Sequence, residues 1–302
     1  MKRRVKVAAI ATLLDLALAE LPNRFHPVAG LGRATNALVV RLPHSTPRSA
    51  LASGVFLAVA IPSAAGLLGA AASRTARRHG TVGLVVEAFL LKQAFALRAL
   101  FAHVERVRRP LATEDIAATR LAAARIVSRD TAGLPAIALA SAAIESLAEN
   151  ASDSVVAPLA WYAVAGLPAA FAYRAVNTLD AMVGYRHFGL FGMPSARLDD
   201  IANFVPARLT ALAITIASCR PATALGTLRD AGRTLSPNSG WPMAAAAHAL
   251  GVRLEKRRHH VLNASGAEPE AGDIRRVQIL VAEALAVLAF AFVCTTRTWR
   301  TT

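Results

Sequence analysis

The residues of this 302-residue chain best suited to chemistry are carboxylates in the stretch IESLAENASDSVVAP, Ile144–Pro158. Glu145, Glu149 and Asp153 follow one another at intervals of four residues, so on an α-helix they form one acidic stripe. Stacked carboxylates repel one another unless a cation or several arginines lie among them. Such a cluster suits Mg²⁺, which binds a few carboxylates together with substrate phosphates. The alternative interpretation, acids that cap a helix and pair with distant arginines, fits the spacing equally well.

Further acids, amides and arginines recur on both sides of this stripe. They are Arg125, Arg129 and Asp130 in ARIVSRDT, Asn177 and Asp180 in YRAVNTLDAMVGY, and Arg197, Asp199, Asp200, Asn203 and Arg208 in RLDDIANFVPARLT. Guanidinium groups suit the recognition of phosphate or carboxylate. Each cluster alone is most simply a salt bridge at a membrane edge, but their density in an apolar chain is difficult to justify by stability. The turn SPNSGW, with Ser236 and Asn238, is a candidate loop around a ligand.

The composition predicts that these residues are carried by membrane helices. Hydrophobic residues make up 55% of the chain and charged residues 18%, and the mean hydropathy is +0.42. Soluble domains carry about 25% charged residues. The apolar surplus is mostly Ala, Leu and Val, which suits closely packed helices. A disordered chain is excluded, and an ordinary soluble enzyme is disfavoured.

Apolar segments of sufficient length give the expected spans. These are Leu51–Ser73, Val82–Phe101, Gly133–Ala148, Ser154–Tyr173 and Val277–Thr296. Pro206–Cys219 would cover only about 21 Å as a helix, which predicts a re-entrant or interfacial segment. We therefore expect an all-α, polytopic integral membrane protein with about five transmembrane helices, re-entrant or interfacial helices and a polar loop region. It would form a single membrane domain over residues 1–302, with a polar cytoplasmic region at about 174–276.

The charge of the chain predicts contact with lipid. The formal net charge is +15, from 34 Lys plus Arg against 19 Asp plus Glu. Arginine-rich connections beside apolar runs favour an anionic membrane surface. Nucleic acid is not expected as a partner, because aromatic residues are only 6% of the chain and no known binding motif occurs. The run Arg257–His260 is interpreted as a solvated or lipid-facing basic patch.

Longer motifs carry a resemblance to a known family. SRDT, AAIESLAENASDSVVAPLAWYAVAGLPAAFAYRAVNTLDAMVGYR and ARLDDIANFVPARLTAL resemble the CobD/CbiB family, membrane proteins of cobalamin biosynthesis called adenosylcobinamide-phosphate synthases. The resemblance extends to LLDLALAELPNRFHPVAGLGR and SPNSGWPMAAAAHALGVRL, and so covers roughly residues 13–255. The stretch 255–276 departs from the family pattern.

The resemblance implies a ligase that uses ATP and Mg²⁺. It would join aminopropanol, or aminopropanol phosphate, through an amide to the free propionate of adenosylcobyric acid. The expected partners are this corrinoid, the amine, membrane lipid and other enzymes of cobalamin biosynthesis, and the expected location is the inner cell membrane.

Together with this resemblance, the clusters define the expected site. The catalytic residues would be Glu145, Glu149, Asn150 and Asp153, and the metal ligands Glu149, Asp153, Asp199 and Asp200. Substrate and ATP would contact Arg125, Arg129, Asp130, Asn177, Asp180, Arg197, Asn203, Arg208, Ser236 and Asn238. Two other functions stay open. One is a transporter or sensor that uses intramembrane acids as a relay. The other is a prenyltransferase with NxxD at Asn177–Asp180 and DDxxN at Asp199–Asn203.

Overall fold

The computed structural model describes residues 2–298, and the side chains of residues 3–294. The described chain is helical apart from one two-stranded antiparallel hairpin and its connections, which confirms the predicted all-α class. The chain divides into two compact units, each built from two separate stretches. Unit 1 comprises Met1–Leu97 and Ala157–Asn203, and unit 2 comprises Arg98–Val156 and Phe204–Thr302.

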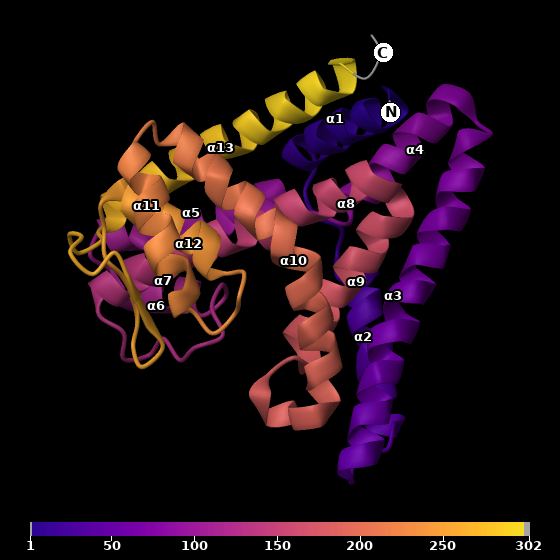
Figure 1. Ribbon diagram of the computed structural model, residues 1–302, viewed down its shortest axis with the longest axis horizontal. Coiled ribbons are helices and arrows are strands. Elements are labelled where there is room, and N and C mark those ends of the chain that lie inside the picture. The colour runs from indigo at the N-terminus through magenta and orange to yellow at the C-terminus, as the bar shows by residue number, and fades with distance from the viewer. Residues whose placement is uncertain (1, 299–302) are drawn as a thin grey trace. The chain divides into compact units, whose positions relative to one another are not determined.

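Unit 1 is a bundle of helices around α3. Its elements are α1 (Lys2–Ala17), α2 (Pro27–Arg41), α3 (Pro47–Arg77), α4 (Gly80–Lys92), α8 (Ala157–Ala165), α9 (Leu167–Val183), the 3₁₀-helix Arg186–Phe188 and the first part of α10 (Gly189–Ala217). α3 lies along α9, while α1 packs on α4 (Figure 1). Gly69 permits the close approach of α3 to α9, because a Cβ atom there would lie 2.9 Å from the carbonyl oxygen of Leu167.

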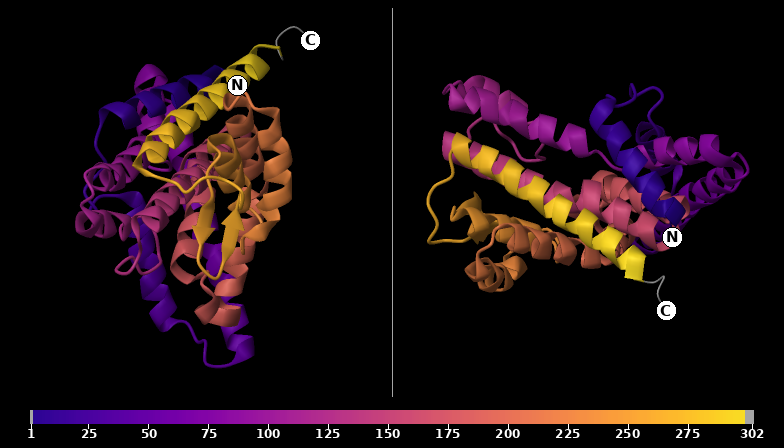
Figure 2. Two further views of the ribbon diagram at one scale, coloured as in Figure 1. Left: turned by 90° about the vertical axis from the view of Figure 1, so that its left-hand side faces the viewer. Right: turned by 90° about the horizontal axis from the view of Figure 1, so that it is seen from above.

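Unit 2 is organised around α7. Its elements are α5 (Leu97–Ala112), α6 (Ile116–Ala123), α7 (Ala136–Ala151), the π-helix Ser152–Val156, the second part of α10, α11 (Pro221–Asp230), the 3₁₀-helix Ala231–Arg233, α12 (Gly240–Leu250), β1 (Leu254–Lys256), β2 (His260–Leu262) and α13 (Ala271–Thr298). α7 packs against α12, α13 and β1, and Figure 2 draws the two strands as arrows. Every residue from Leu139 to Ala148 is buried, so the polar side chains of α7 point into this unit.

Three helices of the described chain are long and apolar enough to cross a membrane. They are Pro47–Arg77, Arg186–Ala217 and Ala271–Cys294. The first contains the predicted span Leu51–Ser73, and α13 contains the predicted span Val277–Thr296. The chain is therefore a helical membrane protein, and its described residues contain fewer long spans than the apolar segments predicted.

The prediction of a separate short helix over Pro206–Cys219 is wrong. Residues 206–217 are the second half of α10, which runs without interruption for 29 residues, or about 43 Å. The polar residues that bounded the apolar window lie within the helix and pair locally, as Arg197 does with Asp200 at 3.4 Å. The expectation that the whole region 174–276 is cytoplasmic requires that this segment does not cross the membrane. That placement stays a prediction, and an α10 that crosses the membrane would contradict it.

The remaining predicted spans are interrupted or buried. Val82–Phe101 is divided between α5 and α4, which ends at Lys92, whose buried side chain pairs with the partly exposed Glu20 at 3.2 Å. Ser154–Tyr173 is broken at Gly166, whose φ of 79° starts a new helix. Gly133–Ala148 overlaps α7, which is buried on all sides from Leu139 to Ala148, as expected of a core helix.

Candidate functional site

Glu145, the first of the predicted catalytic acids, has partners at both of its carboxylate oxygens. Its side chain is only 8% exposed. The Arg129 guanidinium lies 3.3 Å from one carboxylate oxygen, and the Ser141 hydroxyl donates to the other at 3.2 Å. The His260 ring nitrogen Nε2 lies 3.4 Å from that second oxygen. A buried carboxylate is tolerated only when it is paired in this way, so these contacts fix Glu145 in place.

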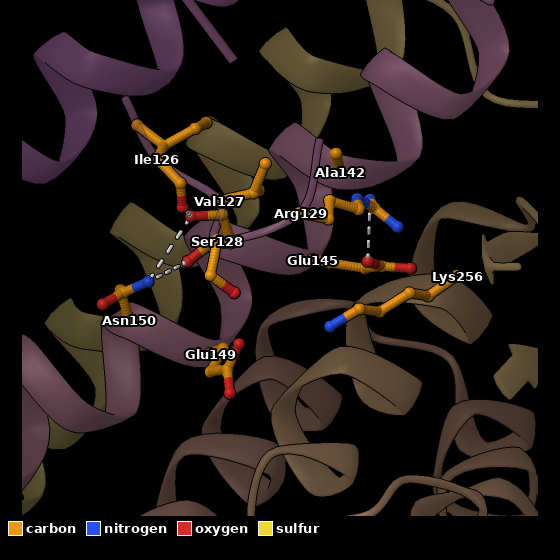
Figure 3. A pocket seen from close by; sticks show the side chains of 10 residues that line it. Ile126, Val127, Ser128, Arg129, Ala142, Glu145, Glu149, Asn150 and Lys256 are labelled. Carbon is orange, nitrogen blue, oxygen red and sulfur yellow. Dashed lines mark hydrogen bonds and ion pairs between the residues drawn. The ribbon is translucent and has the colours of Figure 1, made fainter. Parts of the chain in front are cut away.

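A pocket of about 130 Å³ opens beside Glu145 (Figure 3). Its lining comes from the loop after α6, from α7 and from β1, and consists of Ile126, Val127, Ser128, Arg129, Ala142, Glu145, Ser146, Glu149, Asn150 and Lys256. Glu149 lies one helical turn after Glu145 and is partly exposed. Pockets for drug-sized ligands measure about 300–1,000 Å³. This pocket therefore suits a small group, such as a phosphoryl group or a short amine.

Asp153 does not line this pocket. The α-helix ends at Ala151, and Asp153 lies in the π-helix Ser152–Val156. The wider π-turn rotates residues away from the positions that four-residue spacing gives them on an α-helix, so the predicted stripe is interrupted after Glu149. Isolated π-turns occur often at functional sites, and the catalytic and metal roles of Asp153 stay predictions.

The other predicted residues near the pocket are engaged locally. The Asn150 amide donates to the Ser146 carbonyl oxygen at 2.9 Å. Asp130 is exposed and accepts the backbone N–H of Ala132 at 3.0 Å, as in a loop turn. Arg125 is exposed and does not line the pocket. Of the upstream cluster, Arg129 contacts the acidic stripe, through Glu145.

A second set of predicted residues meets at the SPN turn of unit 2. Arg208 donates to the Asn238 amide oxygen at 2.7 Å and to the Pro237 carbonyl oxygen at 3.2 Å. Its guanidinium carbon lies 4.8 Å from the centre of the Trp241 ring. Ser236 accepts the backbone N–H of Asn238 at 3.2 Å. These contacts shape the turn and leave Asn238 buried.

The NxxD and DDxxN motifs meet in unit 1. Asn177 donates to one Asp199 oxygen at 3.3 Å, and Asn203 donates to the other at 3.0 Å. Tyr173 donates its hydroxyl to Asn203 at 2.7 Å. Two amide groups thus satisfy the Asp199 carboxylate, as expected of a buried polar network. Asp180, the acid of NxxD, is half-buried on α9.

The side chains of the described chain form no preassembled metal centre. No group of three or more His, Cys, Asp or Glu residues among the described residues could hold an ion. Metal binding by the predicted ligands Glu149, Asp153, Asp199 and Asp200 stays a prediction. Mg²⁺ that accompanies a nucleotide needs only one or two protein carboxylates, so the Glu149 side chain in the pocket fits this mode of binding.

Sequence reasoning missed three residues around Glu145, namely Ser141, Lys256 and His260. Ser141 carried a usable signal, because it lies one turn before Glu145 on the same helix. The basic run predicts a solvated or lipid-facing position for His260, yet its side chain is only 7% exposed. Arg257 and Arg258 are exposed as predicted. His260 differs from its basic neighbours because it pairs with Lys256 in the hairpin and contacts Glu145. The run of basic residues alone does not indicate this pairing.

Comparisons with known proteins match nearly the whole chain. Residues 8–288 match the family described as CobD/Cbib protein. "Cobalamin biosynthesis protein CobD" of Rhodobacter capsulatus is 39% identical over 295 residues, which cover 92% of each chain. The protein of the same name from Brucella melitensis is 38% identical, with 93% of each chain covered. "Probable cobalamin biosynthesis protein CobD" of Pyrococcus furiosus is 39% identical, with 93% of this chain and 96% of that one covered. No solved structure gives a significant match.

Proposed function

Because this chain belongs to the CobD/CbiB protein family, we propose that its role in cobalamin biosynthesis is an ATP-dependent amide ligation. It joins aminopropanol or aminopropanol phosphate to the free propionate of adenosylcobyric acid. The observation that carries the proposal is the family match over residues 8–288. The pocket on α7 supports it, because carboxylates and cations face one small volume there.

The chemistry of this ligation explains why both signs of charge are needed. A carboxylate does not acylate an amine, because its delocalised negative charge makes the acyl carbon a poor electrophile and oxide is a poor leaving group. Transfer of the γ-phosphoryl group of ATP to a propionate oxygen forms an acyl phosphate and releases ADP. The amine then attacks the acyl carbon, inorganic phosphate leaves with that oxygen, and the amine loses a proton. Cations stabilise the phosphoryl charge, and a carboxylate accepts the proton.

Residues of the pocket can be assigned to these tasks. Arg129 and its ion pair with Glu145 supply a fixed cation, since the guanidinium is held at 3.3 Å from the carboxylate. Glu149 is the carboxylate that lines the pocket without the deep burial of Glu145. We assign Glu149 to the proton of the amine and to the Mg²⁺ that accompanies ATP. Mg²⁺ would neutralise charge on the phosphates when bound.

Complementation tests the proposed function. A cobalamin auxotroph blocked at aminopropanol attachment is supplied with cobyric acid and a plasmid that carries this gene. Growth is expected with the wild-type gene and not with the Glu149→Gln variant, provided that the membranes contain equal amounts of both proteins. No growth with well-expressed wild-type protein would argue against the ligase. A transporter, sensor or prenyltransferase would not restore growth in this background.

The acyl phosphate has a separate test. Adenosylcobyric acid labelled with ¹⁸O in the free propionate is turned over with ATP and the amine. The released phosphate should carry ¹⁸O, because one propionate oxygen leaves with it. Unlabelled phosphate from a reaction that still forms the amide would exclude this intermediate.

A further inference from the structure

Lys256 is the cation of the pocket that the family resemblance did not assign. We propose that Lys256 and Arg129 form a phosphoryl-binding subsite in the pocket of unit 2. The phosphoryl group would belong to a small phosphorylated amine or to a nucleotide. The chemistry of the subsite comes from the pocket itself, and the choice of these two carriers rests on the proposed function.

The β-hairpin places Lys256 at the pocket. β1 and β2 pair with Leu254 opposite Leu262 and Lys256 opposite His260. Alternate residues of a strand share a face, so Lys256 lies on the same face as Leu254, which is fully buried. His260, its cross-strand partner, reaches Glu145 from this face. The register therefore directs Lys256 toward α7 rather than into solvent.

Backbone contacts hold the hairpin against α7. The N–H of Glu255 donates to the Ser141 hydroxyl at 2.9 Å, and the same hydroxyl lies 3.4 Å from the Glu255 carbonyl oxygen. Ser141 also donates to Glu145 at 3.2 Å. One hydroxyl thus ties the residue before Lys256 to the carboxylate that holds Arg129. Both cations are positioned through the same anchor.

Both cations have N–H donors that no group of the described protein accepts. One terminal nitrogen of Arg129 pairs with Glu145, while its Nε atom is buried and has no hydrogen-bond partner. The Lys256 amino group makes no hydrogen bond or ion pair with any residue that the structure describes, and it extends between Glu145 and Glu149 in Figure 3. Buried donors in native proteins are nearly always satisfied. A guanidinium fork and an ammonium group are the side chains that bind phosphoryl oxygens most often.

Size and charge restrict the ligand further. A pocket of about 130 Å³ holds a phosphoryl group and a few further atoms, but not a corrinoid. Glu145 is neutralised by Arg129 at 3.3 Å, so it does not oppose an anion. Glu149 would face the cation that accompanies the phosphoryl group. In a phosphorylated amine this cation is the ammonium group, and in a nucleotide it is the bound divalent ion.

Binding measurements on the full-length protein in detergent test the subsite. Isothermal titration calorimetry is performed separately with aminopropanol phosphate and with ATP plus Mg²⁺. Lys256→Met keeps the length of the side chain without its charge, and Lys256→Arg keeps the charge. Arg257→Met is the matched control, because Arg257 is the exposed neighbour of Lys256 and does not line the pocket.

The expected result is a 10- to 100-fold rise in Kd, approximately the value of one charge-assisted hydrogen bond, for one of the two ligands in Lys256→Met. Lys256→Arg should restore most of the affinity, and Arg257→Met should bind like wild type. A rise confined to aminopropanol phosphate identifies the amine as the carrier, and a rise confined to ATP identifies the nucleotide.

Equal Kd values for both ligands in Lys256→Met and wild type would overturn the subsite. This failure differs from a failure of the proposed function. A wild-type protein that binds the phosphorylated ligand through Lys256 but forms no amide would retain the subsite and lose the ligase. A wild-type protein that forms the amide, with affinities insensitive to Lys256, would retain the ligase and lose the subsite. If Lys256→Met does not fold, Lys256→Gln is measured in its place, after its melting temperature has been matched to that of wild type.

Discussion

Glu145 and Glu149 lie one helical turn apart on α7, and the same substitution at each should change a different property of the protein. Glu145 is 8% exposed and holds Arg129, Ser141 and His260, whereas Glu149 is partly exposed at the pocket. Replacing each by Gln removes one negative charge and keeps the shape. We expect Glu145→Gln to act mainly on stability and Glu149→Gln to act mainly on turnover.

The magnitude for Glu145→Gln follows from its contacts. A hydrogen bond to a charged group contributes about 1.5–3 kcal/mol. The contacts of 3.2–3.4 Å are long, and the Gln oxygen can still accept from Ser141, which places the loss near the lower end. A loss of about 1.5–2 kcal/mol lowers the melting temperature by about 3–8 °C. Glu149→Gln, at a more exposed position, should change stability by less than about 0.5 kcal/mol.

The assay combines thermal unfolding in detergent with turnover of adenosylcobyric acid. Glu149→Gln should melt within about 2 °C of wild type. It should lose at least about 100-fold in turnover, the usual contribution of a positioned acid or base. Near-normal turnover of Glu149→Gln would show that the acidic stripe is structural. An unchanged melting temperature of Glu145→Gln would refute the argument from buried pairing.

Three further outcomes are expected. Burial of Asp230 raises the pKa of its carboxyl group. Hydrogen bonds from the N–H of Asn263 and from the His248 ring lower this pKa by more, so the net pKa lies below its ordinary value. Asp230 therefore stabilises the fold above the unfolded pKa of about 3.9, and this stabilisation is lost as the pH falls through the folded pKa. The free energy of unfolding, measured between pH 6 and 3, should depend less on pH in Asp230→Asn than in wild type. Arg208→Lys should weaken the SPN turn, because one ammonium cannot serve both Asn238 and the neighbouring carbonyl oxygen, and faster proteolysis of this turn would be its sign. Single cysteines just before and just after α10, in a background lacking both native cysteines, should be labelled from opposite sides of intact cells, because about 43 Å of helix exceeds the roughly 30 Å of membrane core. Labelling from one side only would show that α10 does not span.

Sequence patterns were sufficient for the helical membrane class and for the spans in α3 and α13. Leu51–Ser73 is uncharged and extends to basic residues, and it lies within α3. The patterns did not predict a long helix where charged residues interrupt an apolar segment. Arg197, Asp199 and Asp200 interrupt the apolar run of α10, but they pair with groups one turn away or across to α9, so the helix continues through them.

The candidate site was only partly predictable for a related reason. Glu145 and Glu149 share a face because both lie in regular α-helix, and helical spacing describes them correctly. Asp153 lies in a π-helix that no spacing rule indicates. Lys256 reaches the pocket through the pairing of β1 with β2, a long-range contact that is not encoded in the basic run around it.

The most direct test of the central claim is the reaction itself. Purified protein in proteoliposomes is incubated with adenosylcobyric acid, ATP and Mg²⁺, and with either aminopropanol or its phosphate, and the corrinoid is analysed by mass spectrometry. The account predicts an amide product that requires ATP and is absent with Glu149→Gln. A folded wild-type protein that forms no amide with either amine would contradict it.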